Sequence, residues 1–126
     1  MTQPALTALL AMLALPAAAQ DYDCSARERC QIPSGTCVED QSRLSLHAQG
    51  GRHRIALEGQ PEQSAEALAL GGGLTFLFGE GDVTHQLQIK PDLRFSYQID
   101  HPDTSATGGF AGEVWIGTCK LSGGNS

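Results

Sequence analysis

The chain has 126 residues, a net charge of −6 and 6% aromatic residues, with 15 glycines and 4 cysteines. An acidic domain lacks the positive stripe that binds nucleic acid or anionic lipid, so neither is expected as a partner. About a hundred residues make one small domain, whose thin core would gain from covalent cross-links.

Residues 1–19 have the pattern of a secretory signal. The apolar run from Ala5 to Leu15 is too short for a membrane-spanning helix, and the alanines at 17–19 are small enough for a signal peptidase. We expect cleavage after Ala19 and one exported domain at residues 20–126, periplasmic or secreted, without stable membrane insertion. Because the segment before the run has no Lys or Arg, an uncleaved anchor is the alternative.

Four cysteines, Cys24, Cys30, Cys37 and Cys119, all follow the signal, where disulfides persist. The Pro-Ser-Gly segment at 33–35 can turn the chain sharply, which favours a bond between Cys30 and Cys37. Cys24 and Cys119 then join the first strand to the last, although four cysteines allow three pairings. The spacing lacks a Cys-x-x-Cys pair, so a zinc site is not expected.

Strands are predicted from the start of the exported domain. The first is expected to open at 20–24, and a charged segment with the small disulfide loop follows. Alternating apolar residues at 44–48 and 55–57 predict two more, because period two places alternate side chains on one face of a sheet. Gly50 and Gly51 between them suit a tight hairpin turn, since glycine accepts the positive φ that such turns need.

Residues 62–70 have two interpretations. A preceding proline, early acids and three following glycines suit one short helix. The alternation of alanine with larger or polar residues, over the length expected between two turns, suits a strand. We favour the strand.

The clearest pattern lies in residues 74–99, where three apolar alternations follow one another. They occupy residues 74–78, 83–89 and 93–99. The breaks between them, Gly-Glu-Gly-Asp and Pro-Asp, are typical of turns. The three strands are therefore expected to form an antiparallel meander with one apolar face.

A polar loop is expected at 100–109, and residues 110–121 predict a last strand with a bend at one of its glycines. Seven or eight strands at even spacing indicate an all-β fold, either a small antiparallel up-and-down barrel or a two-sheet sandwich. A bond between Cys24 and Cys119 favours the barrel, because it fastens the terminal strands together and removes open edges.

Two histidines are expected on the inner face. His53 shares a face with Ile55 and Leu57. His85 lies on the apolar face of its own strand, whereas His47 is expected to face outward. Inward histidines could bind a metal, but no third ligand has a predictable place, so we interpret both as hydrogen-bonded wall residues and assign no metal or cofactor.

Catalytic motifs are missing from the sequence. It has no Gly-x-Ser-x-Gly, no His-Glu-x-x-His and no phosphate loop, and its acids are spread over turns and outer faces. We therefore expect a protein that is not an enzyme.

The late loop resembles that of a known family. Residues 105–112, Ser-Ala-Thr-Gly-Gly-Phe-Ala-Gly, followed by Trp115, look like the serine, glycine and aromatic loop of periplasmic inhibitors of C-type lysozyme. These are small disulfide-bonded β-barrels of Gram-negative bacteria whose loop enters the lysozyme cleft. The resemblance implies contact roles for Ser105, Gly108 and Phe110, although the family's basic residue is absent and phenylalanine stands where tyrosine is typical.

The sequence thus favours a binding module for a protein partner in the cell envelope, such as an inhibitor of an envelope-attacking enzyme. A basic enzyme would complement the acidic domain. The alternative is a barrel-type carrier of one small apolar ligand, with a cavity lined by His85, Leu87, Phe95 and Tyr97. A structural or accessory envelope protein is the third possibility, and the oligomeric state is left open.

Overall fold

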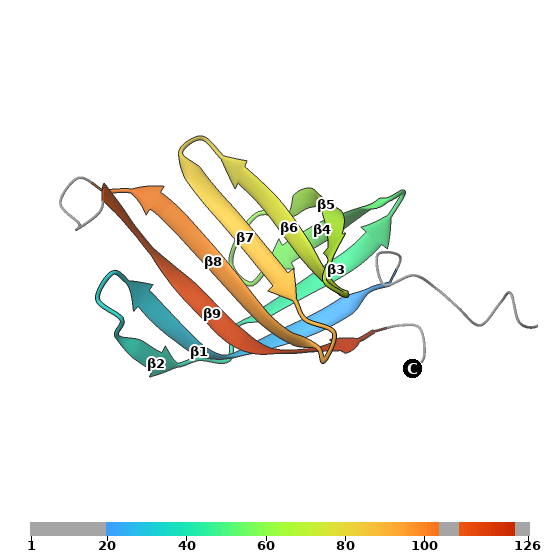
Figure 1. Ribbon diagram of the computed structural model, residues 1–126, viewed down its shortest axis with the longest axis horizontal. Coiled ribbons are helices and arrows are strands. Elements are labelled where there is room, and N and C mark those ends of the chain that lie inside the picture. The colour runs from blue at the N-terminus through green and yellow to red at the C-terminus, as the bar shows by residue number, and fades with distance from the viewer. Residues whose placement is uncertain (1–19, 104–108, 123–126) are drawn as a thin grey trace, which may run out of the picture.

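The computed structural model describes residues 20–103 and 109–122, which form nine strands in one sheet (Figure 1). The strands are β1 Tyr22–Ile32, β2 Cys37–Glu39, β3 Arg43–Gln49, β4 Arg52–Leu57, β5 Gln63–Leu70, β6 Gly73–Glu80, β7 Val83–Ile89, β8 Arg94–Pro102 and β9 Phe110–Leu121. All except β2 form an antiparallel closed barrel of 8 strands. The predicted all-β barrel is confirmed.

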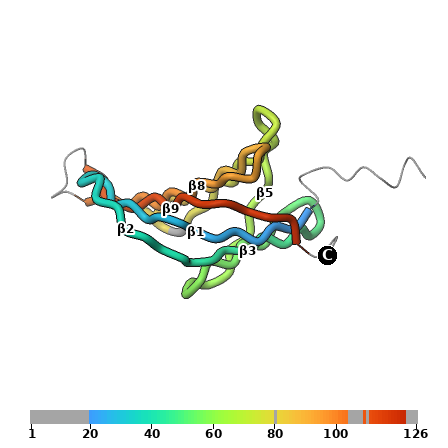
Figure 2. The backbone as a smooth tube through the Cα atoms, turned by 90° about the horizontal axis from the view of Figure 1, so that it is seen from below, coloured from blue at the N-terminus to red at the C-terminus, as the bar shows by residue number. Residues whose placement is uncertain are grey.

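The barrel closes on β1, which pairs along both of its edges. β9 pairs with β1 from one end of β1 to the other, from Tyr22 opposite Leu121 to Ile32 opposite Gly112. The other edge is shared between β3, at residues 22–25, and β2, at residues 28–30. Figure 2 shows β1 lying between β9 and these two strands.

β1 is longer than its sequence pattern indicates, and β2 was not anticipated. The first strand continues through the charged segment to Ile32, because β9 continues to pair with it from Glu28 to Ile32. β2 has only 3 residues, all exposed, which is too short for an alternation to be visible.

A β-bulge between Ala26 and Glu28 reverses which side chains of β1 face inward. Before the bulge, Cys24 and Ala26 are buried in the core. After it, Arg29 lies directly opposite Trp115, whose ring is buried, so Arg29 also faces the interior. Side chains alternate between the two faces of a strand, so one extra residue moves every later side chain to the other face.

The middle of the barrel is packed by side chains from every wall. The largest fully buried side chains are Leu46, His53, Ile55, Phe76, Leu87 and Tyr97. The backbones of β9 and β1 approach each other closely at Gly117. A Cβ at this position would lie 2.1 Å from the Ser25 carbonyl oxygen, so a residue with no Cβ is needed. The bulge of β1 lies opposite Gly117, and the bend expected in the last strand itself stays a prediction.

Residues 63–70 form β5, which confirms the strand interpretation. Its ladder is divided between two neighbours, because residues 63–66 pair with β4 and residues 67–70 pair with β6. Residues 77–80 of β6 therefore have β7 as a partner but no partner in β5. The wall is incomplete on this side.

One end of the barrel carries the β1–β2, β4–β5, β6–β7 and β8–β9 connections, and we call it the mouth end. The incomplete side of the wall lies at this end. In Figure 1 the β6–β7 hairpin and the strands β8 and β9 extend away from β4 and β5 at this end. The opposite end carries the β3–β4 turn, where Gly50 and Gly51 have φ of 59° and 86°, and the β5–β6 and β7–β8 turns. The predicted glycine turn is confirmed.

Both predicted disulfides are present. Cys24 is bonded to Cys119 and Cys30 to Cys37, and each pair lies directly opposite in its ladder with 3.9 Å between Cα atoms. Two disulfides indicate an oxidising compartment outside the cytoplasm. Within the described residues, no helix is long and apolar enough to cross a lipid bilayer.

We expect the two disulfides to stabilise the fold unequally. The Cys24–Cys119 bond closes a loop with a sequence separation of 95, against 7 for Cys30–Cys37. Replacing the first pair by alanine should lower the free energy of unfolding by about 4 to 5 kcal/mol, and the second pair by about 2 to 3 kcal/mol. Urea unfolding of the two double variants measures this, and equal losses would contradict it.

Candidate functional site

A pocket of about 650 Å³ opens at the mouth end. It lies between the inner faces of β1, β7, β8 and β9 and the β4–β5 connection, where the short strands leave the wall incomplete. Its apolar side chains include Leu57, Val83 and Ile99. Its polar side chains include Gln31, Gln63, His101 and Glu58.

Arg29 forms one wall of the pocket and is held there by the segment that follows β2. Its Nε donates to Asp40 Oδ2 at 3.2 Å, and its Nη2 donates to Ser42 Oγ at 3.0 Å. The Ser42 hydroxyl in turn donates to Asp40 Oδ1 at 3.0 Å. Burial opposes ionisation of Asp40, but the Ser42 hydrogen bond and the Arg29 charge outweigh it and lower the pKa of this carboxyl. We call these three residues the clamp.

Trp115, the only tryptophan, links the clamp to β9. The Arg29 guanidinium carbon lies 4.9 Å from the centre of the indole ring, a cation–π contact. The indole Nε1 donates to Glu113 Oε1 at 2.6 Å, and the same oxygen lies 3.6 Å from Arg29 Nε. Arg29 therefore links three parts of the chain, which are β1, the segment at residues 40–42, and β9.

A row of stacked rings crosses the inner face beside Trp115. Phe78 stacks on His85 with 4.8 Å between ring centres, and His85 stacks on Tyr97 at 5.8 Å. The Tyr97 hydroxyl and His85 Nδ1 share a hydrogen bond of 2.5 Å. Burial, with the nearby Glu113 charge, raises the pKa of Tyr97 far above its usual value, so this hydroxyl stays neutral.

The predicted cavity residues separate into two groups. His85 and Tyr97 line the mouth pocket. Leu87 and Phe95 do not line this pocket and belong to the packed core, to which the buried Tyr97 also contributes. Alternation correctly assigned all four side chains to the inner face, but it contains no information on depth.

The residues of the lysozyme-inhibitor resemblance fall mainly in one loop. Ser105 and Gly108 lie outside the described residues. Phe110 begins β9, with its backbone opposite Pro102. The backbone N–H of Asp103 donates to the Gly109 carbonyl at 2.9 Å, so both ends of this loop lie at the mouth end. The contact roles proposed for these residues stay predictions.

Sequence reasoning missed Arg29, Glu113 and Trp115 as pocket residues. Arg29 stands in a charged segment that has no apolar alternation, and the bulge that turns it inward has no sequence signature of its own. Glu113 and Trp115 alternate along β9 and could have been placed on one face together.

The inward histidines contact different residues and are held separately. His53 packs edge-on against Phe76 and contacts Tyr22, and its Nε2 lies 2.9 Å from the Gln20 carbonyl. His85 contacts Phe78 and Tyr97 instead. His47 is exposed, and its Nδ1 lies 3.1 Å from Asp21 Oδ2.

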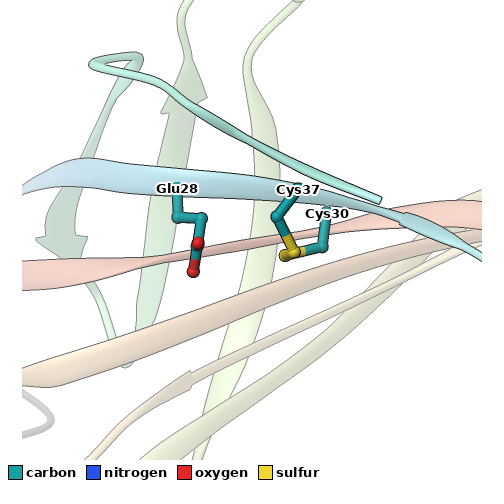
Figure 3. Close-up of side chains that lie close together, drawn as sticks. All are labelled: Glu28, Cys30 and Cys37. Carbon is teal, nitrogen blue, oxygen red and sulfur yellow. A yellow bond between two sulfur atoms is a disulfide. The ribbon is translucent and has the colours of Figure 1, made fainter. Parts of the chain in front are cut away.

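One group of possible metal ligands occurs among the described residues. The carboxylate of Glu28 and the sulfurs of Cys30 and Cys37 lie within 4.8 Å of one another, on the same side of β1 (Figure 3). The two sulfurs are bonded to each other, so neither is the thiolate that binds a metal. In this state the group does not form a metal centre.

A second concavity of about 620 Å³ lies on the outer face of β4, β3, β1 and β9. Its lining includes small side chains such as Ser25 and Ser45, and Asp23 lies directly opposite Lys120. Its described lining contains no aromatic ring and no buried polar network. We therefore take the mouth pocket as the candidate site.

Comparison of the chain with protein-family models, with curated proteins and with solved structures gives no match.

We expect the clamp to stabilise the fold in a pH-dependent way. Because the folded-state pKa of Asp40 is below its usual 3.8, its contribution is complete above that pH and is lost as the pH falls through the lower folded value. Asp40→Asn should lower the free energy of unfolding by about 1 kcal/mol at neutral pH. The difference from the wild type, measured by urea unfolding, should shrink in acid.

Asp92→Asn is the matched control. Asp92 pairs with Arg94 in an exposed turn, with side-chain exposures of 54% and 65%. Solvent screens such a pair, so its loss should be smaller. A larger effect at Asp92 than at Asp40 would contradict the importance given to the clamp.

Proposed function

We propose that the protein binds a small ligand in the mouth pocket. The observation that carries this proposal is one open concavity in which apolar side chains, stacked rings and hydrogen-bonded polar groups converge. Its volume of about 650 Å³ falls within the usual range of ligand pockets. The interior beyond it is packed, so the ligand occupies the barrel end and not the barrel axis.

The charges around the pocket favour an uncharged or cationic ligand. Among the described residues, Arg29 is the one arginine or lysine in the lining, and Asp40 and Glu113 already flank it. Glu58 adds a further carboxylate. An anion would have to displace a carboxylate from Arg29 and approach the others, which costs electrostatic energy.

The ligand we infer has an apolar body and at least one hydrogen-bonding group. Leu57, Val83 and Ile99 offer apolar contact. The side-chain amides of Gln31 and Gln63, which both donate and accept, lie in the same lining. A compound with one neutral polar group matches this division.

The periplasm or the extracellular medium is the proposed location. The signal pattern of residues 1–19 and the oxidising compartment indicated by two disulfides support it. A binding protein there would hold its ligand outside the cytoplasm.

Filling the pocket with a side chain tests the proposal. Ile99 lies between His85 and Glu113 in the ladders, so Ile99→Trp places an indole in the pocket. We expect the wild type to bind Nile red, a neutral apolar dye, and the variant to bind it at least about tenfold more weakly. Dye emission during titration measures this.

Gln86→Trp is the control, because Gln86 is exposed on the outer face of the neighbouring strand β7. It adds the same side chain outside the pocket and should leave dye affinity unchanged. Equal affinity of all three proteins, or no dye binding by the wild type together with no compound in native mass spectra, would refute the proposal.

A protein partner at the same end is the second candidate. The ends of the 103–109 connection flank the pocket, where His101 and Ala111 belong to the lining. A protein that engaged this loop would cover the mouth end. The lysozyme-inhibitor hypothesis expects the purified domain to slow a C-type lysozyme at micromolar concentration. Absence of both inhibition and co-elution would remove it.

A further inference from the structure

The two disulfides differ sharply in exposure. Cys24 and Cys119 have exposed fractions of 3% and 7% and lie in the core. Cys30 is half-buried, and Cys37, the first residue of the short strand β2, is exposed. Thiol–disulfide exchange requires that an attacking thiolate reach a sulfur, so the Cys30–Cys37 bond is the accessible one.

Besides this bond, β2 is held to β1 by backbone hydrogen bonds, such as that from the Gln31 N–H to the Thr36 carbonyl at 2.8 Å, and by the Arg29–Asp40 ion pair, but apolar packing contributes little. The strand has 3 residues, and its one large apolar side chain, Val38, is 59% exposed. Its ladder with β1 has three residue pairs, the last of which opposes Glu28 to Glu39. Like charges directly opposite in a ladder repel each other, so this pair favours separation of the strands. Figure 3 shows Glu28 projecting beside the disulfide.

The chain that leaves β2 supplies two of the three clamp residues, Asp40 and Ser42. Asp40 directly follows the strand, and its backbone N–H donates to the Arg27 carbonyl at 3.1 Å. Its carboxylate holds Arg29 against Trp115 in the pocket wall. Release of β2 would therefore draw Asp40 away from Arg29 and weaken the support of this wall, whereas Ser42 is also held by its carbonyl, which accepts from the Ala26 N–H at 2.8 Å.

We propose that the Cys30–Cys37 disulfide is a redox-sensitive clasp for the mouth pocket. This inference rests on the proposed function, because it concerns the regulation of that same pocket. While the bond is intact, β2 keeps Asp40 in position to hold Arg29. When it is reduced, the Glu28–Glu39 repulsion separates β2 from β1, and ligand affinity falls.

The reaction is an exchange with a dithiol reductant. One thiolate of the reductant attacks Cys37 Sγ, the bond to Cys30 breaks, and the Cys30 thiolate leaves and takes up a proton. The second thiol of the reductant then displaces Cys37 from the mixed disulfide, and Cys37 is protonated. The protein disulfide gains two electrons and two protons, and the dithiol is oxidised to its own disulfide.

Reduction with dithiothreitol under native conditions tests the clasp in two stages. Alkylation followed by peptide mapping should label Cys30 and Cys37 well before Cys24 and Cys119. Hydrogen exchange at residues 37–42 should then become faster, and the emission of Trp115 should change. These readouts need no ligand, so they test the clasp even if the proposed pocket binds nothing.

Dye titration tests the link to binding. Nile red affinity should fall by about tenfold on selective reduction. A variant with both Cys30→Ser and Cys37→Ser should bind as weakly without reductant and should not respond to it. In the reduced protein, Glu28→Gln should restore part of the affinity, whereas Glu66→Gln, an exposed acid on β5, should not.

The outcomes separate the two proposals. If the oxidised protein binds no dye or other compound, the ligand proposal fails. If hydrogen exchange at 37–42 still becomes faster on reduction, the release of β2 by reduction stands without it. If the dye binds equally well before and after reduction, the clasp does not regulate the pocket. If Cys24 and Cys119 are labelled as fast as the other pair, or exchange at 37–42 is unchanged, the clasp itself is wrong.

Discussion

The ladder between β1 and β9 is the constraint on which the rest of the structure depends. It closes the barrel, sets Cys24 opposite Cys119, and extends past the bulge to Ile32. Because the bulge lies inside this ladder, it cannot be removed without shifting every later pair by one position. Arg29 therefore faces Trp115, and a charged side chain becomes part of an inner wall.

Much of the fold could be predicted, because long regular strands have a strong sequence signal. The alternations within 74–99 correspond to β6, β7 and β8, and residues 110–121 form β9. The bulge of β1 and the three residues of β2 could not be predicted. A bulge changes register without changing composition, and a very short strand has no period to detect.

The candidate site was predicted only in part, for a related reason. Period two shows which face a side chain occupies, and it placed His85 and Tyr97 inside together with Leu87 and Phe95. It does not show where the wall stops. The open end follows from the divided pairing of β5, a tertiary property that depends on how far each neighbour extends.

The packed centre of the barrel also limits how molecules could pass through it. Leu46, Ile55, Phe76 and Leu87 fill the cross-section below the mouth end. The pocket therefore ends at this packed centre and does not continue to the opposite end of the barrel. A ligand bound as proposed would therefore enter and leave at the mouth end, and the residues around its rim would control both steps.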